Sequence, residues 1–71
     1  MNGPTPHVSV VIPCYNEQDN IQNCVREVAD VLFVEHIPYE ILVVNDGSSD
    51  HTLAQAHSLM LSNPHVRVID L

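Results

Sequence analysis

The sequence predicts an α/β fold in which three parallel strands alternate with two helices. Residues 8–12, 39–44 and 66–71 are short, apolar and rich in β-branched side chains, as buried strands are. Between them, apolar residues recur at steps of three and four along two longer stretches, which is the spacing of one helical face. Each strand–helix–strand unit is expected to cross over right-handed, so the strands should run parallel in the spatial order 3-2-1.

The predicted domain covers residues 8–71 and follows a lead-in, residues 1–7, whose glycine and two prolines favour flexibility. The nearly all-apolar pattern of the first strand predicts a central strand covered on both faces. Pro13 is expected to end that strand, because proline supplies no backbone N–H to a sheet. A polar turn follows, in which Asp19 or Asn20 can cap the first helix.

The second helix follows six turn-forming residues, 45–50, of which Ser49 or Asp50 can cap it. It is expected to end at the pair Asn63–Pro64, because proline cannot continue a helix. Its predicted buried face comprises Leu53, Ala56, Met60 and Leu61. The whole arrangement corresponds to one βαβαβ half of a three-layer, Rossmann-like nucleotide-binding domain, whose ligands bind beyond the carboxyl ends of the strands.

The composition allows one small hydrophobic core and excludes several kinds of site. The 71 residues include nine acidic and two basic side chains, a formal charge of −7, and no lysine, which excludes a nucleic-acid surface and a P-loop. With only two glycines, the chain lacks the G-x-G-x-x-G loop of dinucleotide-binding proteins. A bound diphosphate would need backbone N–H groups, a metal ion or residues outside this chain. Two cysteines outside any C-x-x-C pair indicate reduced thiols and a cytoplasmic protein.

Polar residues follow the first two strands, at the edge where such sheets bind ligands. They are Pro13, Tyr15 and Glu17 after the first strand, and Asn45, Asp46, Gly47 and Ser48 after the second. Asp46 can accept the N3–H of uracil in a charge-assisted hydrogen bond, or it can cap the Gly47 turn. Tyr15 can pack beside a base or at the rim of the core. The residues alone support both interpretations in each case.

Two segments resemble the signatures of family 2 glycosyltransferases: VSVVIPCYNE, residues 8–17, and EILVVNDGSSD, residues 40–50, followed by Thr52. The resemblance extends from Val8 to Leu71. It implies a GT-A fold and the transfer of a sugar from a UDP- or GDP-linked donor, with Asp46 binding the base. The nucleotide-binding residues that it implies are Pro13, Tyr15, Glu17 and Asp46, with Asn45, Gly47 and Ser48 adjoining them.

The Tyr-Asn-Glu ending of the first segment is most similar to the branch that transfers sugars to polyprenyl or dolichyl phosphate at the cytoplasmic face of the membrane. In the family, the D-x-D motif for Mg²⁺ or Mn²⁺ and the catalytic base lie beyond the third strand. The resemblance therefore implies a truncated domain, with no catalytic residue and no metal ligand among these 71 residues. Membrane contact would be made only by other parts of the enzyme.

Two other classes of protein compete with this interpretation. A non-catalytic nucleotide-binding or interaction module would retain the same half-fold without activity. A receiver-like domain would instead need paired acids at the end of the first strand, where this chain has Pro13 and Cys14. The first alternative therefore stays open, and the second is disfavoured.

Overall fold

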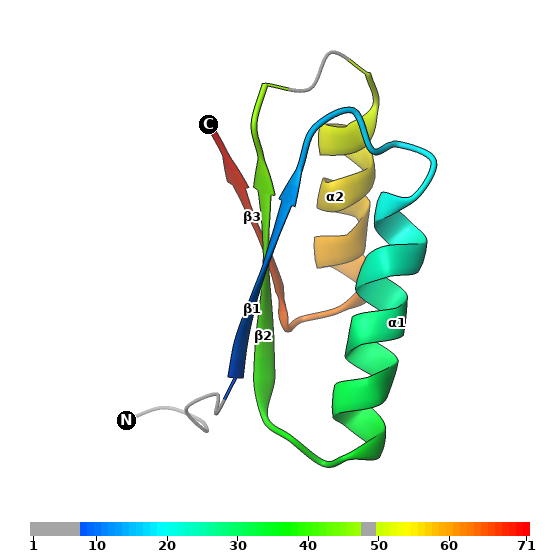
Figure 1. Ribbon diagram of the computed structural model, residues 1–71, viewed down its shortest axis with the longest axis vertical. Coiled ribbons are helices and arrows are strands. Elements are labelled where there is room, and N and C mark those ends of the chain that lie inside the picture. Colours follow the sequence, from blue (N-terminus) through cyan, green and yellow to red (C-terminus); the bar gives the residue numbers. More distant parts are fainter. Residues whose placement is uncertain (1–7, 48–49) are drawn as a thin grey trace.

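The computed structural model describes residues 8–47 and 50–71 and confirms the predicted α/β fold (Figure 1). In chain order the elements are β1 (Val8–Cys14), α1 (Ile21–Val34), β2 (Tyr39–Asn45), α2 (Thr52–Ser62) and β3 (Val66–Asp70). The predicted lead-in, residues 1–7, lies outside the described residues, as do Ser48 and Ser49.

The three strands form one parallel sheet in the order β1-β2-β3, with β2 in the centre, as predicted. Val8 of β1 pairs with Tyr39 of β2, and Cys14 pairs with Asn45 at the other end. Asn45 also pairs with Asp70 of β3. The carboxyl ends of all three strands are therefore level, and the loops after β1 and β2 leave the sheet from the same edge.

The first strand differs from its prediction in two respects. It runs through Pro13 to Cys14, because the ring nitrogen of Pro13 faces away from β2. The backbone groups of successive residues point to alternate sides, and both Val8 N–H and Cys14 C=O bond toward β2. Pro13 therefore costs the ladder no hydrogen bond. The strand is also covered on one face only, since Val11 on the other face is 58% exposed.

Both helices lie against the same face of the sheet (Figure 1). Apolar side chains of the sheet and of the two helices form the core. The buried apolar residues are Cys14, Ile21, Val25, Ala29, Ile41, Val43, Ala56 and Val66. The described residues thus supply two layers of the expected three-layer domain, a sheet and a layer of helices. No helix of the described ranges lies on the opposite face of the sheet.

The buried face of α2 is rotated from the predicted one. Ala56 is buried as expected, but its neighbours in the core are Thr52 and the partly buried Leu59. Leu61 is 90% exposed, so its predicted place in the core is wrong. The shift follows from Thr52, whose hydroxyl forms hydrogen bonds inside the protein and brings a polar residue into the helical face that packs.

Candidate functional site

The loops that follow β1 and β2 meet at the carboxyl edge of the sheet. Cys14 and Asn45 are register partners, and the backbone N–H of Asp46 donates to the carbonyl oxygen of Cys14 at 3.0 Å. This hydrogen bond continues the strand pairing by one step into the loops. It places residues 15–17 beside residues 46–47, as expected for adjacent parallel strands.

The loop after β1 presents its side chains to solvent. Tyr15 is 62% exposed, and Pro13 and Glu17 are also exposed. Asn16 has φ of 52°, in the left-handed region that asparagine tolerates better than most residues. At Asn16 the backbone turns away from the direction of β1. The Tyr15 ring lies at the surface beside the carboxyl edge of the sheet, where a planar ligand could reach it.

The loop after β2 contains one buried and one exposed polar side chain. Asn45 is only 2% exposed, and its Nδ2 donates to Asp70 Oδ1 at 2.9 Å. Asn45 therefore joins the carboxyl end of β2 to that of β3. Asp46 is exposed, and Gly47 after it has φ of 70°, a conformation that favours glycine. The Asp46 carboxylate is thus accessible at the same edge as Tyr15.

A second set of hydrogen bonds ties the loop after β1 to the beginning of α2. The Glu17 N–H donates to Thr52 Oγ1 at 2.7 Å, and the Gln18 N–H donates to Asp50 Oδ2 at 3.3 Å. In return, Gln18 Oε1 accepts the His51 N–H at 2.9 Å. Asp50 Oδ1 accepts the Thr52 N–H at 2.9 Å and also the Thr52 hydroxyl. The N-cap position itself is occupied by His51, so Asp50 binds the first residue of α2 from one position earlier than predicted.

These contacts shift the pKa values of two groups. Burial raises the pKa of the Asp50 carboxyl, but hydrogen bonds from the Thr52 hydroxyl and from the Thr52 and Gln18 N–H groups outweigh it and lower that pKa below 3.8. For Cys14, burial together with the negative charges of Glu17 and Asp50 raises the pKa of the thiol. Asp50 is thus held ionised, and Cys14 is held as the neutral thiol, which donates to the Val44 carbonyl.

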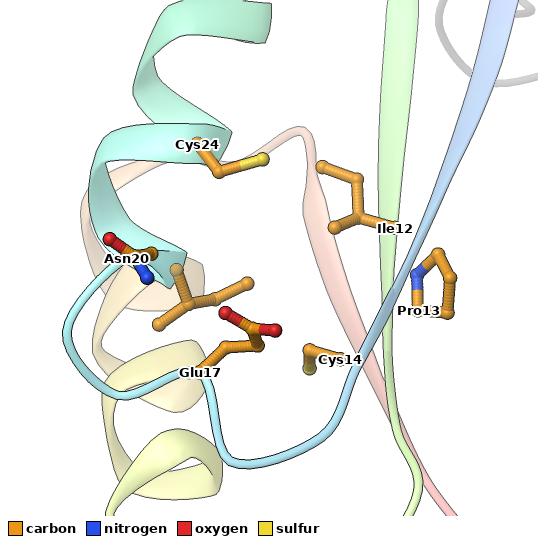
Figure 2. A pocket seen from close by; sticks show the side chains of 7 residues that line it. Ile12, Pro13, Cys14, Glu17, Asn20 and Cys24 are labelled. Atoms are coloured by element: carbon orange, nitrogen blue, oxygen red, sulfur yellow. The ribbon is translucent and has the colours of Figure 1, made fainter.

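An open pocket of about 240 Å³ lies between the end of β1 and the first turn of α1 (Figure 2). Its lining residues are Ile12, Pro13, Cys14, Glu17, Asn20, Ile21 and Cys24. Figure 2 shows Cys24 pointing from α1 toward the strand and the Glu17 carboxylate lying between the helix and Cys14. Glu17 therefore faces this pocket, whereas Tyr15 and Asp46 are not among the residues that line it.

Within residues 8–47 and 50–71, no three histidine, cysteine, aspartate or glutamate side chains gather into a group that could hold a metal ion. In the same part of the chain, neither helix is long and apolar enough to cross a membrane.

The structure thus brings Pro13, Tyr15, Asn45 and Asp46 to one edge, with Glu17 turned to the neighbouring pocket. The predicted Ser48 lies outside the described residues. Sequence reasoning gave no role to Gln18 and named Thr52 only as part of a signature. The one available signal was the Asp-x-Thr spacing at the start of a helix, which predicts a cap but not a partner in another loop.

The level parallel strands and the polar loops at their carboxyl edge define this chain as a Rossmann-like α/β half-domain. Its residues 9–71 match the sequence profile described as Glycosyl transferase family 2. Because this match covers nearly the whole chain, the protein belongs to glycosyl transferase family 2.

Three relatives illustrate the similarity. An uncharacterized glycosyltransferase of Synechocystis is 42% identical over 94% of this chain, and the glycosyltransferase AglE of Haloferax volcanii is 39% identical over 99% of it. Chondroitin synthase of Pasteurella multocida is 39% identical over 90% of the chain. The chain spans only 21%, 23% and 6% of the lengths of these three proteins. It therefore corresponds to a part of a family 2 glycosyltransferase domain.

Proposed function

We propose that residues 8–71 form the nucleoside-binding part of an enzyme that transfers a sugar from a UDP- or GDP-linked donor to an acceptor. The observation that supports this most is the joining of the loops after β1 and β2 by the hydrogen bond from Asp46 N–H to Cys14 C=O. It gives one surface an aromatic ring and an accessible carboxylate. Membership of the family supports the transfer of a sugar.

Each residue of this surface has a role in the proposal. Asp46 accepts an N–H of the base, and the Tyr15 ring packs beside the base or the ribose. Pro13 and Glu17 line the nucleoside, with Glu17 on the side of the pocket. Asn45 holds β2 to β3 through Asp70, so that Asp46 leaves the sheet in a fixed direction. Gly47 and Ser48, which follow Asp46 in the sequence, are proposed to adjoin the nucleotide.

The diphosphate is expected to bind outside this chain. The formal charge of −7 opposes the binding of an anionic diphosphate. The described residues contain no group of three side chains that could hold a divalent cation, so they do not fit the Mg²⁺ or Mn²⁺ ion associated with the family. In the proposal, metal ligands and the catalytic base therefore come from other parts of the enzyme, and these 71 residues bind the donor without catalysing its reaction.

The acceptor is proposed to be a polyprenyl phosphate, on the resemblance of the Tyr15-Asn16-Glu17 segment to that branch of the family. Such an acceptor places the reaction at the cytoplasmic face of a membrane. In the proposal, contact with the lipid is made by parts of the enzyme outside this chain.

The test is to replace Asp46 by Asn in the full-length protein and to titrate it calorimetrically with UDP and with GDP. Asparagine keeps an acceptor oxygen but loses the charge. Because a hydrogen bond to a charged group contributes about 1 kcal/mol more than a neutral one, the Kd for the preferred nucleotide should rise about 5-fold. The unfolding midpoint should be unchanged, because Asp46 is exposed. Asp30→Asn, at an exposed position on α1, is the matched control and should bind like the wild type.

Unchanged affinity in Asp46→Asn would contradict the base-binding role. Nucleotide binding by a full-length protein that transfers no sugar would instead favour the non-catalytic binding module. These two outcomes separate the role of the site from the activity of the enzyme.

A further inference from the structure

We propose that Gln18, Asp50 and Thr52 are positioning residues of the donor site: they hold the loop that carries Tyr15 and Glu17 against the first turn of α2. We call these three residues the loop clamp. The inference rests on the proposed function, because it concerns the geometry of the nucleoside surface. None of the three residues needs to touch the nucleotide.

The clamp captures two consecutive backbone donors of the loop. Glu17 N–H bonds to Thr52 Oγ1 at 2.7 Å, and Gln18 N–H bonds to the Asp50 carboxylate at 3.3 Å. The partners are 35 and 32 residues apart in the sequence, so the contacts are tertiary. Two adjacent N–H groups held by two different side chains fix both the position and the orientation of this peptide segment.

The clamp is closed by bonds in the opposite direction. Gln18 Oε1 accepts the His51 N–H at 2.9 Å, so Gln18 both donates to and accepts from the same turn. The Thr52 hydroxyl accepts from Glu17 and donates to Asp50, and the Thr52 side chain has no exposed surface. In a chain of hydrogen bonds that ends on a carboxylate, each bond strengthens the others. Removing one of them therefore weakens those that remain.

The clamp anchors one end of a very short stretch of chain to α2. The other end is anchored by the hydrogen bond from Asp46 N–H to the carbonyl oxygen of Cys14. Only Tyr15 and Asn16 lie between Cys14 and the clamped Glu17, and Asn16 has a positive φ of 52°. With both ends fixed, the backbone that carries the Tyr15 ring has little freedom to move. Without the clamp, the Glu17 end is held only through its carbonyl oxygen, which accepts the Asn20 and Ile21 N–H groups at the start of α1.

Loss of the clamp should therefore weaken nucleotide binding although no contact with the ligand is removed. A surface that must be ordered on binding has a lower affinity than one that is already ordered, because the ligand then has to supply the ordering free energy. Tyr15 and Glu17 would both become less ordered, since both belong to the clamped loop.

The experiment replaces Thr52 by Val in the full-length protein. Valine has nearly the same shape, so the helix keeps its packing, but the hydroxyl that links Glu17 to Asp50 is gone. We expect the Kd for UDP or GDP, whichever the wild type prefers, to rise about tenfold at a temperature at which the variant is fully folded. Thr52→Ser restores the hydroxyl and should bind within about twofold of the wild type.

The control for a purely structural effect is Tyr39→Phe. It removes the hydrogen bond between Asn63 Nδ2 and the Tyr39 hydroxyl, which lies at the start of β2, the opposite end of the strand from the candidate site. This variant should lose some thermal stability and keep its nucleotide affinity. If Thr52→Val lowered stability in the same way with affinity unchanged, the positioning role would be overturned.

Two further outcomes keep the inference separate from the proposed function. If Asp46→Asn weakens binding and Thr52→Val does not, only the clamp is refuted. If the wild type binds neither UDP nor GDP, the proposed function fails and the clamp role fails with it. Should Thr52→Val not fold, Gln18→Ala decides the matter: it removes only the side-chain bond to His51, and unchanged affinity in that variant overturns the role.

Discussion

Asp50 is the residue on which the hydrogen bonds of the loop clamp converge. Its carboxylate accepts the backbone N–H groups of Thr52 and Gln18 together with the Thr52 hydroxyl. All of these interactions favour the ionised carboxylate, which is why they lower the pKa of Asp50 although burial acts in the opposite direction. The clamp is therefore strongest while Asp50 carries its charge.

This dependence predicts a loss of stability in acid. A carboxyl with a lowered pKa in the folded state contributes stability above its unfolded value, here 3.8, and loses it as the pH falls through the lower folded pKa. The free energy of unfolding of the wild type should therefore fall more steeply below about pH 4 than that of Asp50→Asn. Urea unfolding of both proteins, from neutral pH to about pH 2.5, measures the difference.

Other ionisable side chains lie near Asp50, and the comparison has to account for them. Glu17 and Cys14 lie close enough for their charges to interact, and His51 adjoins Asp50 in the chain. Subtracting the Asp50→Asn curve removes the contributions of these groups to the extent that they are common to both proteins. A difference between wild type and variant that stays constant over the whole pH range would contradict the prediction.

At the scale of elements, α2 shows how a polar contact decides which face of a helix packs against the sheet. Thr52 and Ala56 are buried one turn apart, and Leu59 follows on the same face. Leu61 lies on the other side, where it is 90% exposed. The helix has apolar residues around much of its circumference, so the position of Thr52 decides which of them pack against the sheet.

The two leucines should accordingly differ in their contribution to stability. Leu59→Ala removes a side chain packed against the core and should lower the free energy of unfolding by about 1–2 kcal/mol. Leu61→Ala should change it by less than about 0.5 kcal/mol, because that side chain is already in water. Denaturant unfolding of the two variants tests the observed face, and an equal loss in both would favour the face predicted from the sequence.

The strands and helices could be predicted because each depends on a local pattern. The run of residues 39–44 is apolar enough to be a buried strand wherever the chain places it. The phase of α2 could not be predicted, since it depends on a hydroxyl that bonds to Glu17, 35 residues away. The extension of β1 through Pro13 was missed for a similar reason, because the effect of a proline depends on which side of the strand has a neighbour.

The candidate site divides in the same way. The position of the loops after β1 and β2 was predictable, because the carboxyl ends of adjacent parallel strands lie at the same edge of the sheet. The burial of Asn45, its bond to Asp70 and the partnership of Gln18 with Asp50 were not, because each is decided by three-dimensional contacts between loops or strands. Whether Asp46 and Tyr15 bind a base stays a prediction.

At the scale of the whole molecule, the sheet has one covered face and one open face. Val11 of β1 and Ile69 of β3 are 58% and 43% exposed on the open side, and Leu71 beyond β3 is 73% exposed. No helix within residues 8–47 and 50–71 covers them (Figure 1). An apolar sheet face with an adjacent strand edge favours association with other chains.

The 71-residue chain should therefore self-associate in solution, and Val11→Lys should reduce the association. A lysine at this position places a charge on the open face beside the free edge of β1. Val31→Lys, at a position on α1 that is exposed to a similar degree, 62%, is the matched control and should have little effect. Sedimentation equilibrium over a range of concentrations measures both. A monomeric wild type would show that the open face does not mediate self-association.

The placement of Pro13 limits how far any added strand could reach along β1. The N–H groups that face the free edge belong to alternate residues, Ser9 and Val11, and the next position in that series is Pro13, which has none. A strand that joined this edge would find no N–H donor on β1 at Pro13, just before the chain turns away at Tyr15. The sheet can thus grow sideways while the peptide that carries the aromatic ring stays outside the hydrogen-bonded ladder.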